Sequence, residues 1–154
     1  MAVVIKPLTQ LQAEDIAYHW HYAGEYSFYD MDADEEDLIE FLDPAGRGDH
    51  TYAVSQDDEL TGYFTVQPVE GNICNIGLGM RPDLTGRGAG QAFLKSVLHN
   101  VTVNFHPERI TLAVATFNAR AIKVYLKVGF TAAHTFMQDT NGSSYEFMSM
   151  VYEC

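Results

Sequence analysis

The sequence predicts an α/β fold in which one mixed β-sheet is flanked by helices. Some segments alternate apolar and polar residues as strands do, others repeat apolar residues at helical spacing, and typical turn residues separate them. In chain order the segments read β-α-α-β-β-β-α-β-α-β-β, which gives about seven strands and about four helices. The chain has 154 residues, the size of one domain, so we expect a single domain over residues 1–154.

Capping residues mark the two helices expected in the first part of the chain. Thr9 and Gln12 have the spacing of a capping box, which predicts that a helix starts there. Asp32 or Asp34 can cap the second helix, and Pro44 with the glycines after it ends that helix. Segments rich in β-branched and aromatic residues predict strands over 3–5, 51–55 and 60–67.

The second part reads as strand, glycine turn, helix, strand, helix and hairpin. An apolar strand ends at Met80, Asn118 can cap the last helix, and Gly129 suits the left-handed end of that helix. Asn141-Gly142 predicts a tight hairpin turn. The helix after the glycine turn carries its apolar residues at helical spacing, namely Phe93, Leu94, Val97, Leu98 and Val101. Further strands are expected over 109–115, 131–138 and 145–151.

The glycine turn after Met80 has the character of an anion site. Gly86, Gly88 and Gly90 leave the backbone bare where the helix starts, and there N–H groups and the helix dipole favour a phosphate. A P-loop would need Lys-Ser/Thr after the last glycine, and a dinucleotide fingerprint would need the spacing G-x-G-x-x-G; neither is present. The glycines alone also fit an ordinary turn that caps a helix.

A second segment decides between these interpretations. It reads Asn118-Ala119-Arg120-Ala121-Ile122-Lys123-Val124-Tyr125-Leu126-Lys127-Val128-Gly129-Phe130. Together with Arg87-Gly88-Ala89-Gly90, this segment resembles the two cofactor motifs of the GNAT superfamily of acetyl-CoA-dependent N-acetyltransferases. The resemblance covers most of the chain. One position departs from the pattern, because Thr85 stands where the family usually has Gln or Arg before the glycine turn.

The resemblance implies the GNAT fold, acetyl-CoA as cosubstrate, and direct attack of a primary amine on its acetyl group. The cofactor-binding residues implied in this sequence are Leu78, Gly79, Met80, Thr85, Gly86, Arg87, Gly88, Ala89, Gly90, Gln91, Asn118 and Tyr125. In the family, the loop that joins the first two helices covers the acceptor. The substrate-binding residues implied there are Trp20, Tyr22, Tyr26, Phe28, Tyr29 and Asp30. Simple core packing explains each of these aromatic residues equally well.

Two catalytic residues follow from the resemblance. The N–H of Met80 is the implied donor to the developing oxyanion, and Tyr125 occupies the position that protonates or hydrogen-bonds the leaving sulfur. A tyrosine pKa near 10 keeps such a hydroxyl protonated at neutral pH. Many relatives place a carboxylate base on the fourth strand, but residues 72–78 contain none. The general base stays open among Glu25, Asp30, His134 and an ordered water chain.

The charge distribution bears on the partners. A net charge of −12 argues against nucleic acid, because such a binder must neutralise phosphates with clustered Lys and Arg. Residues 1–60 hold 15 acidic and two basic residues, whereas residues 61–154 hold six acidic and seven basic residues. The asymmetry suits a cationic amine facing the first part and an anionic cofactor on the second. It also suits a solvated acidic surface that aids solubility.

Several function classes are not expected. No apolar run approaches the roughly 20 residues of a membrane span, and the N-terminus has no signal-peptide pattern, so we expect no membrane partner and a cytoplasmic protein. Cys74 and Cys154 are not expected to pair. His19 and His21 lack a third ligand at suitable spacing, so no metal is expected.

Two functions from different classes remain. The first is an acyltransferase whose acceptor is a small cationic amine or a protein amino group; a homodimer is left open. The second is a noncatalytic acyl-CoA-binding sensor or interaction module, which the missing strand-four carboxylate and Thr85 favour. Release of CoA thiol in the presence of an amine separates the two.

Overall fold

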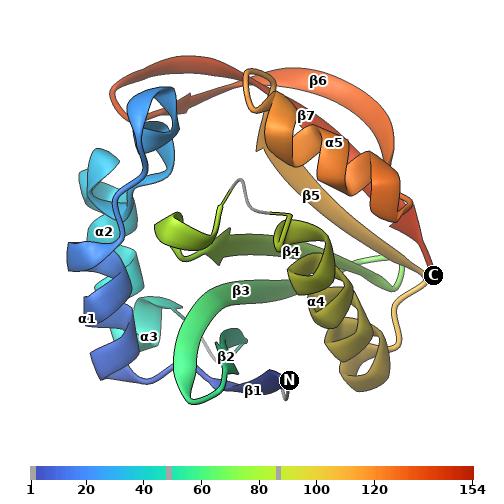
Figure 1. Ribbon diagram of the computed structural model, residues 1–154. Coiled ribbons are helices and arrows are strands. Elements are labelled where there is room, and N and C mark those ends of the chain that lie inside the picture. The colour runs from blue at the N-terminus through green and yellow to red at the C-terminus, as the bar shows by residue number, and fades with distance from the viewer. Residues whose placement is uncertain (1–2, 48–49, 86–87) are drawn as a thin grey trace.

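The computed structural model describes residues 3–47, 50–85 and 88–154 and confirms the α/β prediction (Figure 1). A seven-stranded mixed sheet has the order β1-β2-β3-β4-β5-β7-β6. Only β4 and β5 pair in parallel; the other neighbours are antiparallel. The strands are β1 (Val3–Pro7), β2 (Thr51–Gln56), β3 (Glu59–Val69), β4 (Ile73–Met80), β5 (Arg109–Ala115), β6 (Thr131–Thr140) and β7 (Ser143–Glu153). The α-helices are α1 (Gln10–His19), α2 (Glu35–Leu42), α3 (Pro44–Arg47), α4 (Gly90–Phe105) and α5 (Ala119–Val128), with 3₁₀ helices η1 (Gly24–Tyr29), η2 (Met31–Ala33) and η3 (Pro82–Leu84).

Side-chain caps start three of the helices as the sequence predicts. Thr9 Oγ1 accepts from the N–H of Gln12 at 3.1 Å, and Gln12 Oε1 accepts from the N–H of Thr9 at 2.9 Å, which completes the capping box of α1. Asp34 caps α2 and Asn118 caps α5, each through one side-chain oxygen. Helix α2 ends at Leu42, just before Pro44 as predicted, and the segment from Pro44 forms the four-residue helix α3, which the sequence did not predict. Proline at a first helical position needs no N–H partner, so it can begin this turn.

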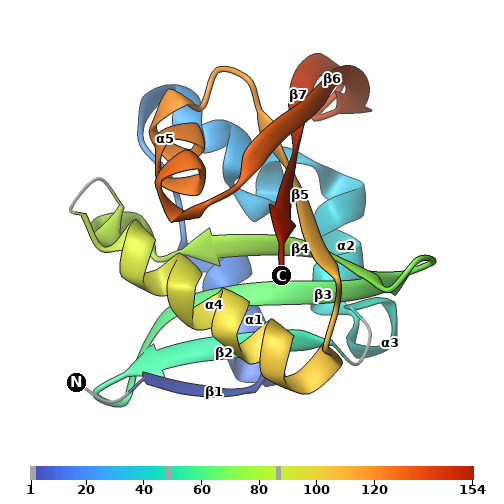
Figure 2. The same ribbon diagram turned by 90° about the vertical axis from the view of Figure 1, so that its right-hand side faces the viewer.

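Helices cover both faces of the sheet (Figures 1 and 2). Successive side chains of a strand point to opposite faces, so Phe64 and Val66 of β3 belong to the core beside α4 and α5, whereas Tyr63 packs against α1 and α2. The first core includes Leu94, Val97, Leu98 and Val101 of α4, as the helical spacing predicts. The second is formed by Leu8, Ala13, Ile16, Ala17, Trp20, Phe41 and Ala53.

The sheet opens between β4 and β5. These strands pair over only three residue pairs, from Ile73 with Arg109 to Asn75 with Thr111, although β4 continues to Met80. In Figure 2, β5 and β7 run steeply across the direction of β1 to β4. The ends of β4 and β5 therefore diverge and leave backbone edges that do not face another strand.

Two composition-based expectations can be compared with the structure. Within the described ranges, no helix is long and apolar enough to cross a bilayer. Cys74 is buried in β4, Cys154 is exposed at the end of the chain, and both are free thiols.

Candidate functional site

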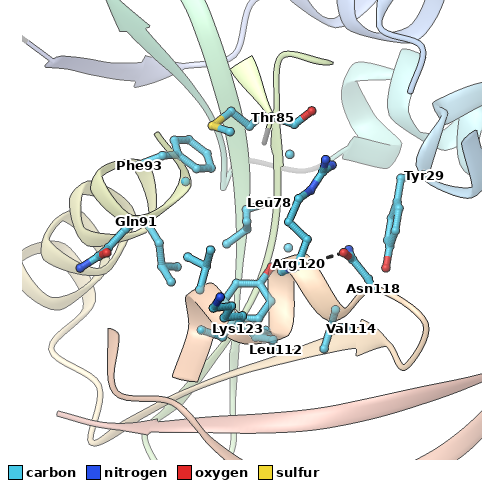
Figure 3. Close-up of a pocket in the computed structure, with 18 of the residues that line it drawn as sticks. Tyr29, Leu78, Thr85, Gln91, Phe93, Leu112, Val114, Asn118, Arg120 and Lys123 are labelled. Carbon is cyan, nitrogen blue, oxygen red and sulfur yellow. Dashed lines mark hydrogen bonds between the residues drawn. The ribbon is translucent and has the colours of Figure 1, made fainter. Parts of the chain in front are cut away.

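A cavity of about 520 Å³ opens where β4 and β5 diverge. Its walls come from the ends of both strands, the start of α4, helix α5 and the loop after α1 (Figure 3). Many residues that the sequence singles out meet in this lining: Tyr22, Tyr26, Tyr29, Leu78, Gly79, Met80, Thr85, Gly88, Gly90, Gln91, Asn118 and Tyr125.

The open edge of β4 directs backbone groups into the cavity. Across β3 and β4, the N–H of Arg81 donates to the carbonyl of Thr61 at 2.8 Å. Hydrogen-bonded and non-hydrogen-bonded positions alternate along an antiparallel pair, so Leu78 and Met80 direct their N–H and C=O groups away from β3. The carbonyl of Met80 accepts from the hydroxyl of Tyr22 at 2.8 Å. The N–H of Met80 faces the same gap.

Gly79 allows an aromatic ring to lie on this strand. A Cβ on Gly79 would come within 2.5 Å of Cε1 of Tyr63, so only glycine leaves room for that ring. Tyr63 lines the cavity, and burial, with a smaller effect of Asp37, raises the pKa of Tyr63 to about 12. Tyr63 is not among the predicted site residues, because its position in a strand does not show what lies across the sheet.

The start of α4 has backbone N–H groups without a side-chain cap. Ala89 occupies the N-cap position and makes no side-chain cap bond, so no capping side chain of the described residues occupies the first-turn N–H groups. Gly88 has φ +78° with open space beside its Cα, and it lines the cavity. The hydroxyl of Thr85 donates to the carbonyl of Pro82 at 2.7 Å, within η3. Two predicted cofactor residues lie outside the described ranges, Gly86 and Arg87.

Helix α5 brings Tyr125 and Asn118 to the cavity. Tyr125 is largely buried in the wall, and this burial, together with the nearby Tyr29, raises the pKa of Tyr125. Its ring centroid lies 5.7 Å from that of Phe130, so packing holds the side chain in place. Asn118 caps the helix, and the hydroxyl of Tyr29 lies against its side chain (Figure 3).

Three basic residues on α5 also line the cavity: Arg120, Lys123 and Lys127. Their spacing of i, i+3 and i+7 places them on one face of the helix, a signal that was readable in the sequence but was not used. The guanidinium of Arg120 lies 4.3 Å from the ring centroid of Tyr26. Among the described lining residues none is Asp, Glu or His, so the cavity is basic although the chain is acidic.

The other predicted acceptor residues lie behind the wall. Trp20 is 5 % exposed and packs in the core beside Tyr63. Phe28 is outside the described lining, and its ring packs against Tyr29, which lines the cavity, and against Phe117, Tyr145 and Phe147, which do not. Asp30 accepts the N–H of Tyr22 at 2.7 Å and lies 3.1 Å from His21 Nδ1. Direct contact of Trp20, Phe28 and Asp30 with an acceptor stays a prediction.

The general-base candidates lie outside the described lining of the cavity: Glu25, Asp30 and His134. The described residues also contain no group of three or more His, Cys, Asp or Glu side chains that could hold a metal ion.

Comparisons with known proteins agree with this geometry. A family model described as acetyltransferase (GNAT) domain matches residues 3–131. No curated protein matches the sequence. Solved structures share the fold, among them an acetyltransferase (GNAT family) from Bacillus anthracis, with TM-score 0.73, 14% identity, and coverage of 98% of this chain and 94% of the other.

Two further similar structures carry more specific names. One is a spermidine N-acetyltransferase SpeG chimera from Vibrio cholerae and hSSAT, with TM-score 0.72, 15% identity, and coverage of 98% and 95% of the two chains. The other is the ribosomal-protein-S18-alanine N-acetyltransferase from Escherichia coli, with TM-score 0.66, 17% identity, and coverage of 99% and 94%. At these identities the likeness shows the fold alone.

Proposed function

We propose that this chain, which belongs to the GNAT acetyltransferase family, transfers the acetyl group of acetyl-CoA to a primary amine by direct attack. One observation carries the proposal: the edges of β4 and β5 diverge into a basic cavity that also receives the uncapped start of α4 and the hydroxyl-bearing Tyr125. This arrangement fits a long anionic thioester better than it fits the other ligands that a glycine turn could hold.

The residues present fit acetyl-CoA at three positions. The peptide groups of Leu78 and Met80 face the cavity and can pair with the amides of the pantetheine arm as a neighbouring strand would. The first-turn N–H groups of α4 suit the diphosphate, because the positive end of the helix dipole lies behind them. Lys123 and Lys127 on α5 supply positive charge for the remaining phosphate oxygens.

When bound, acetyl-CoA supplies an activated acetyl group with a thiol as leaving group. The N–H of Met80 then donates to the oxygen on which negative charge develops, and removal of such a donor typically costs about 10² to 10³ in rate. Tyr125 donates a hydrogen bond to the departing sulfur, and the thiolate takes up a proton from water as CoA leaves. Burial raises the pKa of Tyr125, so its hydroxyl stays protonated and can donate this hydrogen bond.

The proton of the attacking amine needs a different route. Glu25, Asp30 and His134 do not belong to the described lining of the cavity, so we propose that water carries this proton from the cavity to solvent. A water relay requires no side-chain base at the reacting atoms.

The acceptor is a small cationic amine or a protein amino group. The acidic first part of the chain favours a cation at long range. The similar structures include proteins named for spermidine and for a ribosomal protein, which are examples of both acceptor classes. A cytoplasmic location is part of the same proposal.

The test combines binding with turnover. Acetyl-CoA at a hundredfold excess over its Kd should stabilise the fold by about 2.7 kcal/mol, a few degrees in Tm. A thiol-release assay over a panel of amines, from polyamines to peptides with free N-termini, should then show CoA release with at least one acceptor. No thermal shift would contradict the cofactor assignment.

A second candidate is a noncatalytic acyl-CoA-binding module. It is favoured by one observation, the lack of a carboxylate or imidazole among the described lining residues. A thermal shift with acetyl-CoA, combined with no thiol release for any amine of the panel, would support this candidate over the enzyme.

A further inference from the structure

The tip of the β6–β7 hairpin is hydrogen-bonded to the loop that walls the cavity, although the two are more than a hundred residues apart in sequence. Asn141 at this tip makes both bonds. Its side-chain Nδ2 donates to the carbonyl of Phe28 in η1 at 2.9 Å, and its backbone N–H donates to Asp34 Oδ2 at 3.0 Å. Figure 1 shows the hairpin end reaching over to the segment between α1 and α2.

Asp34, which accepts the backbone N–H of Asn141, is itself held in place. Asp34 caps α2 by accepting the N–H of Asp37, and the backbone N–H groups of Asn141 and Asp37 lower the pKa of Asp34. Hydrogen bonds to an ionised carboxylate are stronger than neutral ones. The backbone bond to Asp34 therefore anchors the hairpin tip, and the side chain of Asn141 is left to hold η1.

The bond to Phe28 acts next to the residues that line the cavity. Tyr29 follows Phe28, and its hydroxyl accepts from the N–H of Ala115 at the end of β5 at 3.2 Å. Tyr26, two residues before Phe28, lies under the guanidinium of Arg120. Segment η1 is thus fixed from the hairpin on one side and from β5 and α5 on the other, and no residue of η1 is buried in the core.

We propose that Asn141 is a positioning residue for the amine acceptor: its side-chain amide holds η1 so that Tyr26 and Tyr29 form the acceptor wall of the cavity. Asn141 does not line the cavity, and it acts through the backbone of η1. The role of Asn141 in acceptor binding rests on the proposed acetyl transfer, whereas its effect on the order of η1 does not.

The conformation of Asn141 permits a clean variant. Asn141 has φ +50°, in the left-handed region where glycine is unstrained, so Asn141→Gly keeps the turn and the backbone bond to Asp34. It removes the bond to Phe28 and the 3.3 Å bond that Asn141 Oδ1 accepts from the hydroxyl of Thr140, which can still donate to Asp34.

The chain also offers a matched control. Asn72, with φ +57°, lies in the turn before β4, and its Nδ2 donates to the carbonyl of His106 at 3.2 Å. Asn72→Gly makes the same chemical change away from η1.

The experiment measures hydrogen exchange and kinetics in both variants. Asn141→Gly should speed amide exchange over residues 24–30, and at Ala115, by about tenfold, as loss of one hydrogen bond predicts. It should raise the KM of the best amine by about tenfold while the Kd of acetyl-CoA changes by less than about twofold. Asn72→Gly should leave exchange over 24–30 and the amine KM unchanged.

Each outcome decides the proposal. Unchanged exchange over residues 24–30 in Asn141→Gly would overturn it, because η1 would then be ordered without the Asn141 amide. Faster exchange with an unchanged amine KM would also overturn it, since the loop would not govern acceptor binding. If no amine is acetylated at all, the proposed function fails, and the exchange experiment alone then decides whether Asn141 holds η1.

Discussion

Tyr125 owes its proposed role to where its hydroxyl lies. A tyrosine in water titrates near pH 10, and burial in the cavity wall raises the pKa of Tyr125 further. The hydroxyl is therefore protonated at neutral pH. A hydroxyl with such a raised pKa is a weaker acid than a thiol, whose pKa is near 8.5, so Tyr125 assists the departing sulfur by donating a hydrogen bond and keeps its proton.

Replacement of Tyr125 by Phe tests this role. The change removes one hydroxyl and keeps the ring that packs on Phe130, so the fold and the cavity should persist. We expect kcat to fall by about 10², as loss of one hydrogen bond to charge that develops in the transition state predicts, with the Kd of acetyl-CoA changed by less than about twofold. Tyr152→Phe is the matched control, because Tyr152 also packs on Phe130 but lies outside the cavity lining. Equal kcat values for the two variants would assign Tyr125 to packing.

The residues that the sequence predicted differ in kind from those it missed. Asn118 and Tyr125 sit at fixed positions of a local motif, and the structure brings both to the cavity. Tyr63 reaches the same cavity from β3, the strand next to β4. Local spacing does not encode such tertiary relations, so no reading of neighbouring residues would have found Tyr63.

At the scale of elements, helix ends were more predictable than strand partners. A helix cap depends on one or two neighbouring residues, and the predicted starts of α1, α2 and α5 are correct. The point where β4 and β5 part depends on the sheet as a whole. Pairing ends after Asn75, and no local pattern in either strand marks that point.

Helix α5 contributes both Tyr125 and basic side chains to the cavity, and the basic side chains can be tested separately. Lys123→Gln and Lys127→Gln should each weaken acetyl-CoA binding several-fold, because each removes one positive charge facing a polyanion. Both side chains are exposed, so the loss should shrink at high ionic strength, where screening acts. Titration calorimetry of both variants at low and high salt measures this effect. Lys95→Gln on α4 is the control, since Lys95 is exposed and outside the lining. An equal loss in Lys95→Gln would reduce the effect to net charge.

At the scale of the whole molecule, the net negative charge of the chain is opposite in sign to the charge of the side chains that line the cavity. The chain carries −12, and much of the acidic excess sits on exposed positions such as Glu35, Glu36 and Asp37 at the start of α2. The described cavity lining has basic side chains and no acidic ones. The sequence therefore shows that acidic residues are concentrated in the first part of the chain, but it does not show that none of them is in the described lining of the cavity.

The tyrosines around the cavity also make the whole fold sensitive to alkali. Burial raises the pKa of Tyr22, Tyr63 and Tyr125 above that of an unfolded tyrosine, which is near 10. Below that pH both states keep these protons, and stability is unaffected. Above it the unfolded chain releases protons that the folded chain retains, so the free energy of unfolding falls as pH rises, by about 1.4 kcal/mol per pH unit for each such tyrosine. Urea unfolding from about pH 8 to about pH 11 measures this slope.

Tyr63, whose pKa is raised to about 12, gives the cleanest variant. Tyr63→Phe should make the fall of the unfolding free energy with pH shallower by up to about 1.4 kcal/mol per pH unit, the contribution of one proton. Tyr18→Phe removes an exposed hydroxyl and should leave the slope unchanged. A slope that is equal in wild type and Tyr63→Phe would show that Tyr63 loses its proton as readily in the folded chain as in the unfolded one.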